Sequence, residues 1–268
     1  MLSRLDITQN FMQDFQTDIK RDRIDLIDVL ADIRLINVAE IKIIQEVVGF
    51  INANYQEHKS IISPAKVAAL ILNREDVPNL YATSFRGHNN QVLEFQNQFG
   101  IGGFKIKEKL VPWALDKVIR SGLPQSLHQD LTMAIDTSRS STPLDDNDLL
   151  EVFATINLAN VAEFQIIKEA VRCIKKHYPE AARQINLSDV CALVLNHDAV
   201  TSVYATSAEE YEELKETYVS KYQPQVNPII RQIVEKIHTE GSEYSFSHDS
   251  LVAVNFQRRR RLTKLWNI

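Results

Sequence analysis

The stretch Val67-Ala-Ala-Leu-Ile-Leu-Asn73 is followed, after seven residues, by Tyr81-Ala-Thr-Ser84. The stretch Val190-Cys-Ala-Leu-Val-Leu-Asn196 is followed, again after seven residues, by Tyr204-Ala-Thr-Ser207. A constant offset of 123 aligns residues 25–84 with residues 148–207 without a gap, and 28 of the 60 aligned positions are identical. The chain therefore contains an internal duplication.

The duplication divides the 268 residues into two units, each long enough for a core of its own. We predict a first helical domain over residues 1–134, a linker over 135–147 and a second helical domain over 148–241. Residues 242–268 are expected to form an irregular basic tail. The linker prediction rests on Ile135-Asp-Thr-Ser-Arg-Ser-Ser-Thr-Pro143, which has polar and turn residues and no apolar period.

The composition favours helices, because the chain has only 7 Gly and 8 Pro. Apolar residues recur at helical spacing over residues 2–20, which predicts a leading amphipathic helix. The same spacing over residues 24–55 predicts one long helix, or two that are broken near Ile36-Asn37. The counterpart of this segment spans residues 149–178.

Capping residues mark the other expected helices. Ser63-Pro64 predicts a helix start, with the helix running to about Arg74, and Ser188-Asp189 predicts its equivalent. Ser207-Ala-Glu-Glu210 predicts a capping box and a helix through Tyr222. Closing helices are expected over residues 107–120 and 227–239, each stopped by a glycine.

The bulk charge and the cysteine usage indicate a soluble cytoplasmic protein. The net charge is −5, so contact with nucleic acid is expected only through a local basic patch. The residues aligned with Cys173 and Cys191 are Phe50 and Ala68, which favours core thiols in a reducing compartment. No apolar run is long enough to span a membrane, and the N-terminus does not read as a signal peptide.

Motifs for catalysis are absent from the sequence. There is no glycine-rich phosphate loop, no His-Glu-x-x-His, no Cys-x-x-Cys and no Gly-x-Ser-x-Gly. The seven histidines do not have metal-ligand spacing. The sequence therefore predicts a protein that is not an enzyme and has no metal and no cofactor.

Three repeated features are candidates for a site, and each has a structural alternative. The pairs Asn37/Glu40 and Asn160/Glu163 fit buried hydrogen bonds within the fold or an interface. Asn73 and Asn196 end apolar helices, where a left-handed C-cap is the simpler interpretation and a ligand contact the other. Tyr81 and Tyr204 fit either core positions or the wall of a stacking pocket.

The C-terminal cluster has the same two interpretations. Arginines chelate phosphate oxygens, and the cluster lies beside Trp266. It is therefore a candidate for binding nucleic acid or another phosphate-bearing partner, and a solvated tail is the alternative. Its basic residues are Arg258, Arg259, Arg260, Arg261 and Lys264.

The order of these motifs resembles the late-competence ComFB family. In the second unit the resemblance rests on Asn160-Glu163-Ile166, Asp189-Val190-Ala192-Leu195-Asn196 and Tyr204-Ala205-Thr206-Ser207. In the first unit it rests on Asn37-Glu40-Ile43, Val67-Ala69-Leu72-Asn73 and Tyr81-Ala82-Thr83-Ser84. The resemblance covers most of both units. It implies an all-α fold in which two tandem ComFB-like domains form a covalent pseudo-dimer.

The resemblance also implies a signalling receptor for cyclic di-GMP that regulates a protein partner. The implied ligand-binding residues are Asn73, Arg74, Tyr81, Thr83, Ser84 and Arg86 in the first unit, and Asn196, His197, Tyr204, Thr206 and Ser207 in the second. The loops between Asn and Tyr are longer than is usual in the family and carry Glu75, Asp76 and Asp198, which repel an anion. The alternative is a ligand-free interaction scaffold that uses the pseudo-dimer surface and the basic tail.

Overall fold

The computed structural model describes residues 33–56, 58, 60–100, 105–122, 145–241 and 250–266. The fold is all-α, as predicted, and its only strands among these residues form two short antiparallel pairs. The first repeat comprises β1 (Ile36–Asn37), α2 (Val38–Asn54), α3 (Pro64–Leu72), β2 (Tyr81–Ala82), α4 (Phe85–Phe99), a π-helical turn (Ile106–Leu110) and α5 (Val111–Gly122). The second comprises α7 (Asp146–Thr155), β3 (Ala159–Asn160), α8 (Val161–His177), α9 (Leu187–Leu195), β4 (Tyr204–Ala205), α10 (Ala208–Lys221) and α11 (Gln223–Glu240), and α12 (Ser250–Trp266) follows.

One of the two predicted alternatives for residues 24–55, the break near Ile36-Asn37, is observed before α2 and has a local cause, while residues 24–32 lie outside the described residues. Asn37 is extended and its side chain accepts hydrogen bonds from the N–H groups of Ala39 and Glu40, so it caps α2. Asn160 caps α8 in the same way through the N–H of Ala162. Because each Asn lies directly before a helix, its backbone is free to pair with the strand at Tyr81 or Tyr204.

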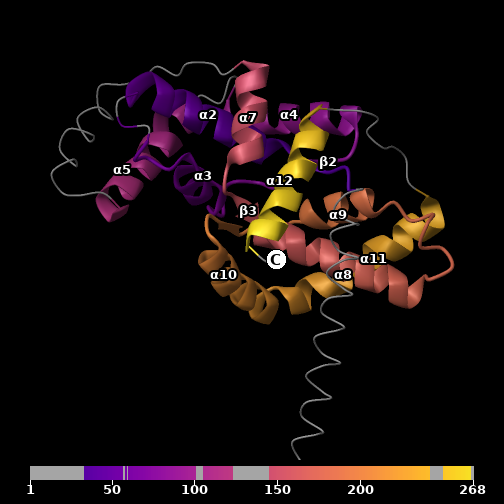
Figure 1. The fold of residues 1–268 in the computed structure, drawn as a ribbon. Coiled ribbons are helices and arrows are strands. Elements are labelled where there is room, and N and C mark those ends of the chain that lie inside the picture. The colour runs from indigo at the N-terminus through magenta and orange to yellow at the C-terminus, as the bar shows by residue number, and fades with distance from the viewer. Residues whose placement is uncertain are drawn as a thin grey trace, which may run out of the picture.

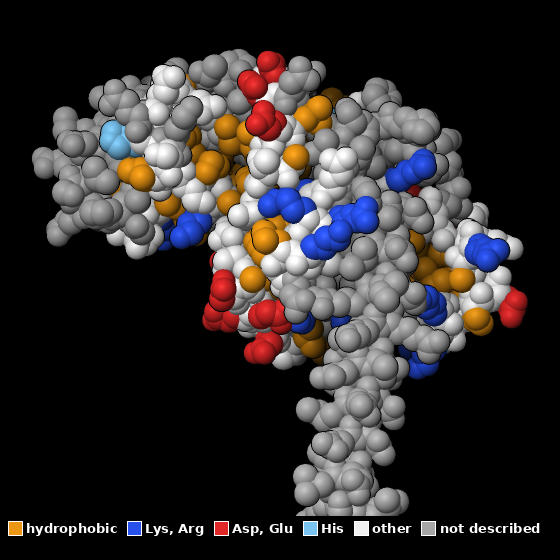
Figure 2. Space-filling model, viewed as in Figure 1, with side chains coloured by type: hydrophobic (Ala, Val, Ile, Leu, Met, Phe, Trp, Pro, Cys, Tyr) orange, Lys and Arg blue, Asp and Glu red, His pale blue; other side chains and the backbone are white. Residues whose placement is uncertain are grey.

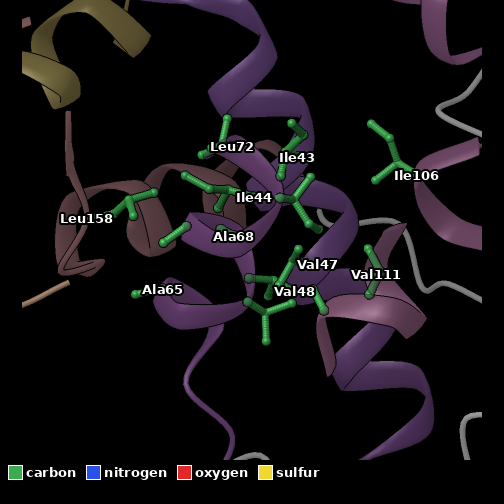
Figure 3. Packing of buried hydrophobic residues seen from close by; sticks show 14 of the residues in the cluster. Ile43, Ile44, Val47, Val48, Ala65, Ala68, Leu72, Ile106, Val111 and Leu158 are labelled. Carbon is green, nitrogen blue, oxygen red and sulfur yellow. The ribbon is translucent and has the colours of Figure 1, made fainter. Parts of the chain in front are cut away.

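Two buried clusters form the core, and each draws residues from both repeats. The first joins α2 and α3, whose inward residues are shown in Figure 3, to Ile156 and Leu158 of the second repeat. The second joins α8, α9 and α11 to Ile33 and Leu35 of the first repeat. Since the exchanged residues are equivalent by the offset of 123, the repeats swap the segments that precede their central helices, and neither core lies within one predicted domain.

The predicted irregular tail is wrong over most of its length. Residues 250–266 form α12, which lies across the junction of the two repeats beside α7 (Figure 1). Arg258 and Arg259 are buried, so the solvated interpretation of the cluster is wrong for these two residues, whereas Arg260 and Lys264 are exposed.

Several predicted boundaries need correction. The predicted linker ends inside α7, because Asp145 is the N-cap of that helix. Asn186, and not Ser188, caps α9, since its side chain accepts from the N–H groups of Ser188 and Asp189. The first closing helix does not stop before its glycine, because α5 includes Gly122 and follows a π-helical turn.

Other boundaries are confirmed. Ser63 caps α3, Ser207 caps α10, and α11 ends before Gly241, whose φ of 81° is in the left-handed region. However, α11 begins at Gln223, four residues earlier than predicted. Cys191 is fully buried and Cys173 is half-buried. The predicted leading helix over 2–20 and residues 135–144 of the predicted linker lie outside the described residues.

Candidate functional site

Each signature tyrosine is held by the opposite repeat through its backbone. The N–H of Tyr81 donates to Asn196 Oδ1 at 2.7 Å, and Asn196 Nδ2 donates to the carbonyl of Tyr81 at 2.8 Å. The equivalent pair is reciprocal, since the N–H of Tyr204 donates to Asn73 Oδ1 at 2.6 Å and Asn73 Nδ2 donates back at 3.0 Å. The two Asn residues therefore satisfy partly buried backbone groups of the opposite repeat.

This use of Asn73 and Asn196 differs from the predicted left-handed cap. Both residues do end their helices, but their φ values are −82° and −84°. The right-handed conformation turns each amide toward the other repeat. The prediction of the C-cap position is confirmed, and the prediction of its conformation is wrong.

The hydroxyl groups of the tyrosines also enter the opposite repeat. Tyr81 Oη donates to Glu163 Oε2 at 2.8 Å and accepts from Asn160 Nδ2 at 2.9 Å. In the equivalent site, Tyr204 Oη lies 3.3 Å from Glu40 Oε2 and accepts from the amide of the N-cap Asn37 at 2.9 Å. Burial raises the pKa of both phenols well above the ordinary value, so both hydroxyls keep their protons and donate.

Helix α12 supplies the counter-charges for the two glutamates. Arg258 Nη2 lies 2.5 Å from Glu40 Oε1, and Arg259 Nε donates to Glu163 Oε1. All four side chains are nearly inaccessible to solvent. Burial raises the pKa of Glu40, and the positive charge of Arg258 opposes this shift. Two neighbouring arginines of one helix thus neutralise one carboxylate in each repeat.

Further contacts hold α12 in place. Asn255 Nδ2 and Arg259 Nη2 both donate to the carbonyl of Leu35 at 2.9 Å. The guanidinium of Arg258 lies over the ring of Phe153, 4.8 Å from its centroid. Arg261 donates to the carbonyls of Thr155 and Ile156. These interactions use three of the four tail arginines within the fold.

The two loops between Asn and Tyr meet across the repeat junction. Ser202 Oγ donates to Asn79 Oδ1, and these two residues are equivalent by the offset of 123. Between the loops is a cleft of about 670 Å³, which we call the loop cleft; its lining includes Arg74, Glu75, Glu94, Asn196, His197 and Asp198. Three of these side chains are acidic. Arg74 is also paired with Asp76, with Nε 2.7 Å from Oδ1, so the cleft is unfavourable for an anion.

A second cleft, of about 480 Å³, lies between β2, α4, α9 and α11, and we call it the Thr83 cleft. Its lining includes Tyr81, Thr83, Ser84, Gln91, Asp189, Asn196, Lys236 and Glu240. Thr83 Oγ1 already donates to Asp189 Oδ1 at 2.5 Å, and Ser84 Oγ accepts from the N–H of Gly87 as the N-cap of α4. The charged side chains here are two acids and one lysine.

The second repeat uses the equivalent residues differently. Glu210 takes the place of Gly87 and accepts from both the N–H and the Oγ1 of Thr206 at 2.7 Å. Ser207 is committed to capping α10. Of the predicted residues, Tyr81, Thr83, Ser84 and Asn196 share the Thr83 cleft, and Arg74, Asn196 and His197 share the loop cleft. Arg86 is exposed and lines neither.

The sequence interpretation did not place Asn79, Asp189 and Ser202 among the candidate site residues, although Asp189 belongs to a motif that carries the family resemblance. Their repeat counterparts are Ser202, Lys66 and Asn79, so none is identical in the two copies. A search for identical positions cannot find them. The signal in the sequence for Asn79 and Ser202 is that they occupy equivalent positions, as expected of residues that meet on a pseudo-two-fold axis.

Fold and site together define an all-α protein in which two sequence repeats exchange segments and are bridged by α12. Comparison with family models, with curated proteins and with solved structures gave no match. The resemblance to the ComFB family therefore stays a prediction. In the part of the chain that the structure describes, no helix has both the length and the apolar character needed to cross a membrane. Within the same residues, no three His, Cys, Asp or Glu side chains are grouped as metal ligands.

Proposed function

We propose that the chain is a non-enzymatic interaction scaffold, in which two fused repeats act as one rigid pseudo-dimer. One observation carries this proposal, namely that each signature tyrosine is buried in the opposite repeat. There it bonds to an Asn at its backbone and to an Asn and a Glu at its hydroxyl. The Tyr and Asn groups that the family resemblance assigns to a ligand are thus bonded within the protein itself, and freeing the tyrosine hydroxyls would leave buried polar atoms without partners.

The scaffold is complete within one chain. In a homodimer, the exchanged tyrosines would belong to two subunits, whereas here both are supplied by the duplication. We expect the full-length protein to be a monomer of 30.7 kDa at micromolar concentration. Light scattering coupled to gel filtration measures this mass. A dimer that persists on dilution would show that the repeats exchange between chains, and would contradict the intramolecular pseudo-dimer.

A second candidate function, a receptor for cyclic di-GMP, is favoured by the Thr83 cleft. Its volume of about 480 Å³ lies within the usual range for small-molecule sites, and four predicted residues line it. Its two acids oppose an anionic ligand, as do those of the loop cleft. The first candidate therefore takes precedence.

Isothermal titration calorimetry with cyclic di-GMP separates the two candidates. The scaffold proposal expects no heat of binding when cyclic di-GMP is added to the wild type. If there is heat, it should be the same in the double variant Arg74→Ala/Arg86→Ala and in Thr83→Ala as in the wild type. The control is Arg120→Ala, because Arg120 is an exposed arginine far from both clefts in sequence and paired only with Asp116 in the described residues. Micromolar binding that weakens at least about tenfold, or about 1.4 kcal/mol, in the double arginine variant or in Thr83→Ala but not in the control would overturn the scaffold proposal in favour of the receptor.

A further inference from the structure

A basic groove lies between α8 and α11, away from the repeat junction. It has a volume of about 310 Å³ and is lined by Glu169, Arg172, Cys173, Lys176, His177, Asn227, Ile230 and Arg231. We call it the α8–α11 groove. Figure 2 shows Lys and Arg side chains as separate patches on the visible face, and the groove is defined by its lining residues. The groove therefore concentrates positive charge on a chain whose net charge is −5.

The cations of the groove come from both helices. Arg172 is held by Glu169, with Nη1 2.7 Å from Oε1. Lys176 and Arg231 are exposed, and neither forms an ion pair with another described residue. Burial raises the pKa of the half-buried Cys173 thiol, the charge of Arg231 opposes that shift, the charge of Glu169 adds to it, and the charge of Lys176 opposes it. The charges of Arg231 and Lys176 are thus both felt at the Cys173 thiol.

Helix electrostatics account for only part of this charge. Lys176 lies in the last turn of α8, where cations complement the helix dipole. Arg231 lies near the middle of α11, so the dipole gives no reason for a cation there. The dipole of α11 therefore does not explain why Arg231 lines the same groove as Lys176 of α8.

The first repeat shows that the fold does not need these cations. Residues 168–177 include four Lys or Arg, whereas the equivalent residues 45–54 include none. Gly49 and Ala53 stand at the positions of Arg172 and Lys176. Because the helices of both repeats form with and without the charges, the charges belong to the surface of the second repeat alone.

We propose that the α8–α11 groove binds the phosphate group of a small phosphate monoester. Arginine presents a planar fork of donors that suits phosphate oxygens, and Arg172 and Arg231 face the groove from its two sides. Lys176 adds a point charge, and Asn227 adds an amide. The volume of the groove suits a small ligand, in contrast to the long basic stripe that an extended polyanion requires.

Cys173 provides a reporter within the groove itself. The chain has two cysteines, and Cys191 is fully buried, so a neutral maleimide reacts selectively with Cys173 in the folded protein. A phosphate bound beside the thiol blocks access and offsets the cations that favour the reactive thiolate. The probes are inorganic phosphate and adenosine monophosphate, with ionic strength held constant by sodium chloride.

Saturating phosphate or adenosine monophosphate is expected to slow labelling of the full-length protein about fivefold or more. The protection is expected to disappear in Arg172→Ala/Arg231→Ala and to weaken in the milder Arg231→Gln. Lys215→Ala is the matched control, because Lys215 is a surface cation on α10 and lies outside the groove. It is expected to leave the protection intact.

Three outcomes would overturn the proposal. One is equal protection in the wild type and in both groove variants. Another is equal protection by chloride alone, which would indicate general screening. The third is protection by heparin but by neither probe, which would indicate a surface for an extended polyanion. None of these outcomes affects the scaffold proposal, whose tests concern the repeat junction.

Discussion

Replacement of Asn196 by alanine tests whether the repeated Leu-Asn motif holds the two halves together. The change removes two hydrogen bonds to Tyr81, at 2.7 and 2.8 Å, and leaves the N–H and the carbonyl of Tyr81 without these partners. An unsatisfied buried polar group costs about 1 to 3 kcal/mol. Both groups are only partly buried, so we expect a total loss of about 2 to 4 kcal/mol.

Urea unfolding followed by circular dichroism measures this loss, and thermal unfolding is expected to show a decrease of roughly 5 to 15 °C in the melting temperature. Asn73→Ala removes the reciprocal pair and is expected to have a similar effect. Asn90→Ala is the matched control, because Asn90 is exposed on α4. There the higher helix propensity of alanine predicts no loss, and at most about 0.7 kcal/mol of gain.

The assignment would be refuted if Asn196→Ala and Asn73→Ala both stayed within about 0.5 kcal/mol of the wild type, the range of ordinary surface substitutions. Such a result would free the two amides for a ligand, as the family resemblance implies. A loss confined to one variant would show that the two halves are not equally dependent on the exchange.

Three other predictions concern the hydroxyls and charges around the junction. Tyr81→Phe removes the hydroxyl that bonds to Glu163, and we expect a loss of about 1 to 3 kcal/mol in urea unfolding, with an unchanged far-ultraviolet spectrum. Arg259→Met leaves Glu163 buried without its cation and is expected to cost about 3 to 5 kcal/mol, whereas Arg260→Met, on the exposed face of the same helix, should cost little. The pKa of Glu40 is raised in the folded state, so the free-energy cost of burying its charge is present in full above that raised pKa and disappears as the pH falls below the unfolded value of 4.5. The stability of the wild type relative to Glu40→Gln should therefore increase as the pH is lowered from neutral to 4.5. No change in this difference would contradict the assigned shift.

The architecture of each repeat could be predicted because its causes are local. Apolar spacing identified α2 and α8, and capping residues such as Ser63 and Ser207 identified the starts of α3 and α10. The break before α2 was predicted as one of two alternatives. Asn37 decides between them, because its side chain satisfies the first N–H groups of α2 and so replaces the preceding turn of helix.

The exchange between repeats could not be predicted, because periodicity does not say which core an apolar residue enters. Leu35 and Leu158 are identical residues at equivalent positions, and each is completely buried. A packing of each residue in its own repeat would give the same sequence pattern. Only the three-dimensional pairing shows that Leu35 lies in the second core and Leu158 in the first.

The same limitation applied to the candidate site. Tyr81 was interpreted either as a core residue or as the wall of a pocket. In the structure it is a core residue that also lines a cleft. Its side chain is buried in the second core, and the residue also lines the Thr83 cleft. The sequence identified the residue correctly, but its role depends on partners that lie 79 to 115 positions away in the chain.

Helix α12 shows what a buried charge can indicate before its partner is known. Glu40 and Glu163 are identical in the two repeats and lie in the first turns of apolar helices, where an ionised carboxylate needs a counter-charge. Because the two carboxylates are related by the pseudo-symmetry of the repeats, a single element can serve both only from a position between them. Successive residues of a helix point roughly 100° apart, so two adjacent arginines on one helix can reach one carboxylate on each side. Arg258 and Arg259 meet this requirement, and α12 is therefore the element whose position depends on both repeats at once.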